Sequence, residues 1–294
     1  MRKQVADYEI LRPLGDPADE RGPLLARASG ATAGDHEAGQ NEGGQQGNDL
    51  RESSQHQSSP HDDSQGEVVV HVLDDHWQTT LDRMRTVASL KAQQVGKVLD
   101  VGVDERSEPK VGYVVTEYLP SGSIAGAKTL APKDLLGCLA QAASGAHALH
   151  EAGIAHGGIS PKAIFHARGG VLAPPPPPLG EDGAVAVAQP ATRLETIDPA
   201  VLRGDGTSRA TDIWSLGATA HFLLTGGKSL HPELGKDHPV TAVQRTLFQP
   251  VIIANSLPAH VGELIASCLR SDPARRPTSA AELSHQFAQL AAAA

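Results

Sequence analysis

The sequence has few aromatic residues, only two cysteines and no long apolar run. Four Phe, two Trp and three Tyr among 294 residues predict a core made mostly of aliphatic side chains and alanine. Cys138 and Cys268 lie within apolar helical patterns, which favours small buried thiols in a reducing compartment over a disulfide. No apolar stretch approaches the roughly 20 residues of a membrane-spanning helix, and residues 1–8 lack the apolar segment of a signal peptide.

Positive charge is also scarce. The chain carries 25 Lys and Arg against 34 Asp and Glu, a formal net charge of −9 at pH 7. This balance disfavours binding to nucleic acids or to anionic membranes. We therefore expect a cytoplasmic protein that binds no nucleic acid and does not insert into a membrane.

Residues 28–66 interrupt the apolar pattern of the N-terminal part. They contain one large aliphatic residue, Leu50, no aromatic residue, and seven acidic residues against a single Arg. Such a segment cannot bury enough apolar surface to offset the loss of conformational entropy, about 1–2 kcal/mol per residue. We predict that it is a disordered loop inserted between two strands.

The remaining pattern predicts an α+β protein with two lobes. Short β-branched runs and one helical pattern indicate a small sheet-rich unit, with strands at 8–11, 24–27, 68–73, 97–103 and 111–118 and a helix at 77–90. Apolar residues spaced by three and four then predict helices at 135–149, 210–224, 261–269 and 279–290. We assign residues 1–119 to a small lobe and residues 120–294 to a larger helical lobe.

Five segments, in this order, resemble the bacterial eukaryote-like serine/threonine protein kinases. They are VVVHVL at 68–73, YVVTEYL at 113–119, HGGISP at 156–161, DIWSLG at 212–217 and DPARRPT at 272–278. Each motif is weak alone, but the five at family-like spacing cover almost the whole chain apart from residues 28–66. The resemblance implies the two-lobed protein-kinase fold, with a hinge near residues 117–119.

The resemblance also identifies the positions that serve phosphoryl transfer in kinases, and each is replaced in this chain. These positions are the strand Lys, the helix Glu, the base Asp, the catalytic-loop Lys and Asn, and the Asp of the metal-binding Asp-Phe-Gly motif. Their counterparts here are, in that order, His71, Arg83 (with Asp82 beside it), Gly158, Ser160, Ala163 and Pro175 within the run Pro174–Pro178. An unperturbed imidazole is mostly neutral at pH 7, and proline offers a metal ion only its carbonyl.

The nucleotide cleft that the family implies would be formed by Gly15, His71, Thr116, Glu117 and Leu119. Gly15 is the single glycine left in the glycine-rich loop, and acidic residues at 16, 19 and 20 stand where phosphates would lie. We therefore expect a vestigial cleft that holds no cofactor and no metal ion.

Residues that support the architecture of the family persist. They are His156, Asp212, Trp214, Gly217 and Arg276. The resemblance implies that Asp212 accepts hydrogen bonds from the backbone around His156, and that Trp214 and Gly217 pack the same helix. It also implies that Arg276 pairs with a glutamate, whose place is taken here by Ala200. Either Arg276 pairs with Asp198 instead, or this link is lost.

Retained architecture without catalytic groups is typical of a pseudokinase, a protein-binding scaffold or regulator without phosphotransfer. The alternative is a serine/threonine protein kinase with relocated catalytic residues and weak binding of ATP and Mg, for which Lys162, Glu181 and Asp182 are the candidates.

Two further readings concern the prolines and the histidines. The five consecutive prolines form either an exposed polyproline II segment for a docking domain or a stiff spacer. A metal site at His147, His150 and His156 is not expected, because the resemblance gives His156 a structural role.

Overall fold

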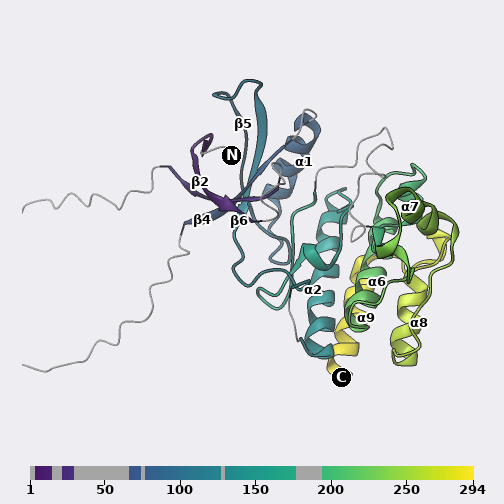
Figure 1. Ribbon diagram of the computed structural model, residues 1–294. Helices are drawn as coiled ribbons and strands as arrows, with labels where there is room; N and C mark the ends of the chain where they lie inside the picture. Colours follow the sequence, from purple (N-terminus) through teal and green to yellow (C-terminus); the bar gives the residue numbers. More distant parts are fainter. Residues whose placement is uncertain (1–3, 15–21, 30–65, 74–76, 127–129, 177–193) are drawn as a thin grey trace, which may run out of the picture.

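The computed structural model describes residues 4–14, 22–29, 66–73, 77–126, 130–176 and 194–294. Three features of the sequence lie outside these ranges: the body of the insertion, the loop with Gly15, and the carboxylates Glu181 and Asp182. The described residues form a sheet-rich lobe and a helical lobe (Figure 1). The predicted two-lobed α+β fold is therefore confirmed.

The small lobe is built on a six-stranded antiparallel sheet with the strand order β1-β2-β3-β4-β6-β5. Its strands are β1 (Gln4–Val5), β2 (Tyr8–Pro13), β3 (Leu24–Ala28), β4 (Glu67–Val72), β5 (Val98–Asp104) and β6 (Val111–Glu117). The two strands that flank the insertion pair with each other, and Arg27 lies opposite Glu67 at the ends that the insertion joins. Such a position tolerates a long connection, because each doubling of loop length costs only about 0.6 kcal/mol.

Helix α1 (Trp77–Ser89) packs against one face of this sheet. It buries Leu81, Met84 and Val87 in the main core together with Val114 of β6. The neighbours of Val114 in the strand point to the other face, as the two-residue period of a strand requires. These neighbours, Tyr113 and Val115, form a second, smaller core together with Val5, Ala26 and Val70.

The large lobe consists of helices and one short hairpin. Its elements are α2 (Pro132–Glu151), η1 (Pro161–Ala163), β7 (Ile164–Phe165), β8 (Val171–Leu172), α5 (Pro199–Leu202), α6 (Arg209–Leu224), η2 (Leu234–Lys236), α7 (Pro239–Phe248), α8 (Ala259–Cys268), η3 (Pro273–Arg275) and α9 (Ala280–Ala293). The four predicted helices are α2, α6, α8 and α9, whereas α5 and α7 were not predicted. Helix α7 buries Ala242 and Thr246. Its sequence carries Val240, Val243 and Leu247 at helical spacing, a signal from which the helix could have been predicted.

The core of the large lobe lies between α2, α6, α8 and α9. Cys138 and Cys268 are buried free thiols within it, as predicted. Gly217 allows α6 to approach α8, because a Cβ at this position would lie 2.5 Å from the Cβ of Cys268. Among the helices in the described part of the chain, none combines the length and the apolar character needed to cross a bilayer.

The buried carboxylate of Asp212 joins three parts of this lobe. Its Oδ2 accepts the N–H of His156 at 2.7 Å, and its Oδ1 accepts the N–H of Gly157 at 2.8 Å. The Nε2 of His150, on α2, lies 2.8 Å from Oδ2. The hydrogen bonds that the resemblance implied are therefore present, and they hold the loop after α2 against α6.

Replacing Asp212 by Ala is expected to lower the free energy of unfolding by about 2 kcal/mol or more. Two buried backbone N–H groups would lose their acceptor, and each such loss costs about 1–3 kcal/mol. Chemical denaturation followed by circular dichroism measures the change. The matched control is Asp82→Ala, since Asp82 is exposed and pairs with Arg85 at the surface, where ion pairs contribute at most about 1 kcal/mol. Overlapping denaturation curves for Asp212→Ala and the wild type would contradict this role.

Candidate functional site

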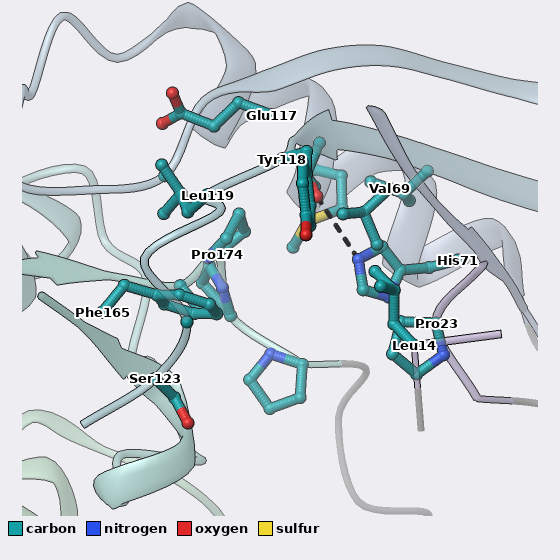
Figure 2. A pocket seen from close by; sticks show the side chains of 18 of the residues that line it. Leu14, Pro23, Val69, His71, Glu117, Tyr118, Leu119, Ser123, Phe165 and Pro174 are labelled. Atoms are coloured by element: carbon teal, nitrogen blue, oxygen red, sulfur yellow. Dashed lines mark hydrogen bonds between the residues drawn. The ribbon is translucent and has the colours of Figure 1, made fainter. Parts of the chain in front are cut away.

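An apolar cavity of about 480 Å³ lies between the two lobes. Strands β4 and β6 and helix α1 form its wall on the small-lobe side, and β7 and the segment after β8 form the wall on the large-lobe side (Figure 2). Four of the five residues predicted for the cleft line it: His71, Thr116, Glu117 and Leu119. The fifth, Gly15, is outside the described residues.

His71 projects from β4, and its Nε2 lies 3.4 Å from the Oγ1 of Thr116 (Figure 2). Burial lowers the pKa of this imidazole from about 6.5 to about 4, because the charged form is disfavoured away from water. His71 is therefore neutral at pH 7. It provides no cation at the position where kinases hold a lysine.

Arg83 connects α1 to the large lobe. Its Nη1 donates to the carbonyl of Pro176 at 3.3 Å, and its Nη2 donates to the carbonyls of His156, at 3.1 Å, and of Ala155. Burial lowers the pKa of Arg83, and the charge of Asp212 opposes that change. In place of the Lys–Glu pair of kinases, which links β4 to α1, this chain has a link from α1 to the loop after α2.

Gly158 and Pro176 are in close contact at the predicted position of the catalytic base. A Cβ at residue 158 would lie 2.6 Å from the Cγ and 3.1 Å from the Cδ of Pro176. Because Cβ atoms do not approach other heavy atoms within 3.0 Å, any side chain here would displace Pro176. An aspartate at this position and the proline run in its present place therefore exclude each other sterically.

His156 holds the same segment through both ring nitrogens. Its Nδ1 accepts the N–H of Gly158 at 3.1 Å, and its Nε2 lies 3.0 Å from the carbonyl of Ala173. An imidazole with the proton on Nε2 satisfies both contacts and is neutral. Burial lowers the pKa of His156 to about 4, although the charge of Asp212 and the Ala173 carbonyl oppose this.

The other replaced positions place no side-chain oxygen at the cavity. Ala163 takes part in backbone pairing, since its carbonyl accepts the N–H of Ala173 at 2.7 Å and its N–H donates to the carbonyl of Ser160 at 2.9 Å. Pro175 is buried in the lining. Lys162, the candidate for a relocated cation, is exposed and does not line the cavity. Within the described ranges, no three His, Cys, Asp or Glu side chains gather as metal ligands.

The described part of the proline run is not the exposed polyproline II docking segment that was one of its two interpretations. The three described members of the run, Pro174–Pro176, face the cavity between the lobes. They are therefore not part of an exposed docking segment. Pro177 and Pro178 lie outside the described residues.

Arg168 is a residue of this site that the sequence analysis did not identify. It donates to both carboxylate oxygens of Glu117, at 2.7 and 3.0 Å, and the N–H of Lys97 donates to the same group at 2.8 Å. Burial raises the pKa of Glu117, but these hydrogen bonds and charges outweigh it, so the pKa lies below its ordinary value. Arg168 lies in the loop between β7 and β8, where no periodic pattern marks it.

Arg276 pairs with Asp198, one of the two outcomes left open by the sequence. Its Nη1 donates to Oδ2 of Asp198 at 2.5 Å, and both side chains are buried. The N–H of Ala200 donates to Oδ1 of the same aspartate at 2.9 Å. The guanidinium also lies 5.1 Å from the ring centroid of Trp214, a distance at which a cation and an aromatic ring attract each other.

Known proteins with similar sequences are kinases. The family model described as "Protein tyrosine and serine/threonine kinase" matches residues 51–287. The chain is 28% identical to "Serine/threonine-protein kinases drp72" of Corynebacterium efficiens over 184 residues, which are 58% of this chain and 34% of that protein. It is 28% identical to serine/threonine-protein kinase PkaB of Streptomyces coelicolor over 175 residues, 55% of this chain and 41% of that protein.

A third relative is serine/threonine-protein kinase PknB of Mycobacterium tuberculosis, 24% identical over 213 residues, 68% of this chain and 33% of that protein. The chain thus spans about a third to two fifths of the length of these relatives. Because the family model matches well over half of the chain, from β4 of the small lobe to α9 of the large lobe, the chain belongs to the protein kinase family. Its relatives are the bacterial eukaryote-like serine/threonine kinases that the motifs indicated.

Replacing Gly158 by Ala is expected to destabilise the protein by about 1–3 kcal/mol, because the added methyl group overlaps Pro176. The matched control is Gly137→Ala in α2, where a Cβ meets nothing within 4 Å. That change is expected to stabilise the helix by about 0.5–1 kcal/mol. Urea denaturation of the two variants measures both effects. Equal stabilisation by the two substitutions would contradict the contact between Gly158 and Pro176.

The free energy of unfolding is expected to fall as the pH is lowered from about 6.5 to about 4. His71 and His156 have pKa values of about 4 in the folded chain and about 6.5 when unfolded. The unfolded state therefore binds more protons in this window, which makes stability rise with pH. Urea denaturation between pH 7 and pH 4 tests this. His71→Gln is expected to reduce the pH dependence, and His166→Gln, at an exposed residue, to leave it unchanged.

Proposed function

We propose that this member of the kinase family is a pseudokinase, which binds another protein as a scaffold or regulator and neither transfers phosphate nor binds Mg-ATP. The observation that carries the proposal is the contact of Pro176 with Gly158, at the place from which a catalytic aspartate would project. A general base contributes about 10²–10⁴ in rate. In this chain the packing leaves no room for such a base, because a side chain at residue 158 would displace the proline segment.

The charge around the cavity is a second line of support. Kinases stabilise the phosphates of ATP with a lysine and with magnesium ions held by Asn and Asp side chains. Here His71 is neutral at pH 7, and neither Ala163 nor Pro175 has a side-chain oxygen. The sequence between β2 and β3 adds three carboxylates, at residues 16, 19 and 20. The positions that would hold the charge of a nucleotide thus lack the groups to do so.

A protein-binding role is supported by the links that hold the kinase shape. Asp212 and the pair of Arg276 with Asp198 fix the large lobe. Arg83 joins the small lobe to it through three backbone carbonyls. A kinase-shaped chain whose lobes are joined in this way is suited to present a fixed surface to a protein partner. The identity of the partner and the cytoplasmic location belong to the proposal.

The alternative function is a serine/threonine protein kinase with relocated catalytic residues and weak binding of ATP and Mg. Family membership and the charges at Lys162, Glu181 and Asp182 favour it. The exposed position of Lys162, away from the cavity lining, disfavours it. This alternative predicts measurable phosphate transfer, so one assay separates the two functions.

The purified protein is expected to transfer no labelled phosphate from ATP to a generic acceptor protein and to give no heat of binding with millimolar Mg-ATP. The physical reason is that the positions of the strand Lys, the base Asp and the metal-binding Asn and Asp, here His71, Gly158, Ala163 and Pro175, supply no cation, base or metal ligand, and such losses are not simply additive. The kinase PknB of Mycobacterium tuberculosis, assayed in parallel, serves as the positive control.

Two results would contradict the pseudokinase proposal. One is binding of Mg-ATP with micromolar affinity. The other is incorporation of label that Lys162→Ala or Asp182→Ala abolishes, which would support the relocated-catalyst alternative.

A further inference from the structure

We infer that the cavity between the lobes is a binding site for an uncharged, largely apolar small molecule rather than for a nucleotide. The inference rests on the proposed loss of Mg-ATP binding and adds the chemical class of the ligand. The cavity measures about 480 Å³, which is within the range of small-molecule pockets, about 300–1,000 Å³.

The lining of the cavity is mostly apolar. Val69 of β4 and Phe165 of β7 line it from the two lobes (Figure 2). The buried side chains of Met84 and Val114 continue the apolar lining toward α1, and Pro174–Pro176 form a further part of the wall. A lining of this kind favours an apolar ligand, because removing apolar surface from water drives binding.

The lining offers no counter-charge to an ionic ligand. Among the described residues around the cavity there is no Lys or Arg. The carboxylate that lines it, Glu117, is already bonded to Arg168. An anion would therefore lose hydration without gaining a cation, and a cation would have to compete with Arg168, so both carry an uncompensated cost of desolvation. The cavity thus discriminates against charge of either sign.

Polar side chains interrupt this apolar lining at several places, among them Thr80, Ser123 and the pair of His71 and Thr116. His71 and Thr116 lie together on neighbouring strands, β4 and β6, with 3.4 Å between Nε2 and Oγ1. A neutral imidazole has one donor and one acceptor nitrogen, and burial keeps His71 neutral down to about pH 4. A largely apolar ligand with a hydroxyl or amide group matches this arrangement.

The proline segment limits how far a ligand can extend toward the position of the catalytic base. Pro176 contacts Gly158 and its carbonyl is bonded to Arg83, so the segment is held in place at the catalytic-base position. Pro174 is also close to the small lobe, since a Cβ at Gly96 would lie 3.0 Å from its Cδ. A compact ligand fits this geometry better than one with a long charged chain.

Two probes with the same ring system test the inference on the full chain: 2-naphthol, which is uncharged at neutral pH, and 2-naphthyl phosphate, which is an anion. Binding of each probe is measured by titration calorimetry at about 0.15 M salt, because salt at this concentration screens the net negative charge of the protein. We expect 2-naphthol to bind, and 2-naphthyl phosphate to bind at least about tenfold more weakly because its phosphate finds no counter-charge.

Two variants place the binding site. Ser123 lines the cavity (Figure 2), so Ser123→Phe is expected to weaken 2-naphthol binding by about tenfold through loss of space. Ser121→Phe introduces the same side chain two residues away, at an exposed position outside the lining, and is expected to leave binding unchanged. Circular dichroism shows whether each variant is folded. If Ser123→Phe does not fold, the comparison of the two probes on the wild-type chain still decides.

Three results would overturn the inference: no binding of 2-naphthol to the wild type, equal affinity for the two probes, or equal weakening by the two Phe variants. These results are separable from the test of the proposed function. Mg-ATP binding with phosphate transfer defeats the pseudokinase proposal. Absence of 2-naphthol binding, with Mg-ATP also unbound, defeats only the inference about the cavity.

Discussion

The carboxylate of Asp212 is fully buried, so its charge has to be balanced by hydrogen bonds, and the donors that balance it determine the shape of the site. They are the backbone N–H groups of His156 and Gly157 and the imidazole of His150, whose Nε2 lies 2.8 Å from Oδ2. Gly157 has a φ of +72° and would place a Cβ 2.8 Å from Thr207, so glycine suits this turn. By fixing these two amides, Asp212 also fixes Gly158, which follows directly.

The positions that serve phosphoryl transfer in kinases are replaced in this chain, and the residues around them pack against one another. Pro176 occupies the space next to Gly158. Kinases have a glutamate that pairs with the strand lysine at the position of Arg83, whereas Arg83 donates to the carbonyl of Pro176. Two of the replaced positions, Arg83 and Gly158, thus contact the same residue, Pro176. Restoring one catalytic residue, such as an aspartate at 158, would disturb the segment that Arg83 and His156 hold.

The fold was predictable because it depends on patterns that recur along the chain. The β-branched run around Val114 marks a strand, and the spacing of Leu81, Met84 and Val87 marks a helix. The site was predictable only in part, because motif alignment gives the position of a residue along the chain but not its direction in space. Arg83 was placed at the right helix, but its link to the large lobe was not foreseen. The contact of Gly158 with Pro176 and the pair of Glu117 with Arg168 join segments that no periodic pattern relates.

The shape and the polarity of the cavity have different origins. Its volume is set by side chains that the two-lobed fold itself positions, such as Val69 on β4 and Phe165 on β7. Its polarity is set by the few positions at which kinases carry charged groups, and His71 and Pro175 have removed those charges. Because the fold-determining residues do not depend on the charged ones, the cavity persists after the catalytic groups are gone. A mostly apolar lining between two lobes of kinase shape therefore requires no remodelling of the core, and apolar contact is the main interaction that such a lining can offer a ligand.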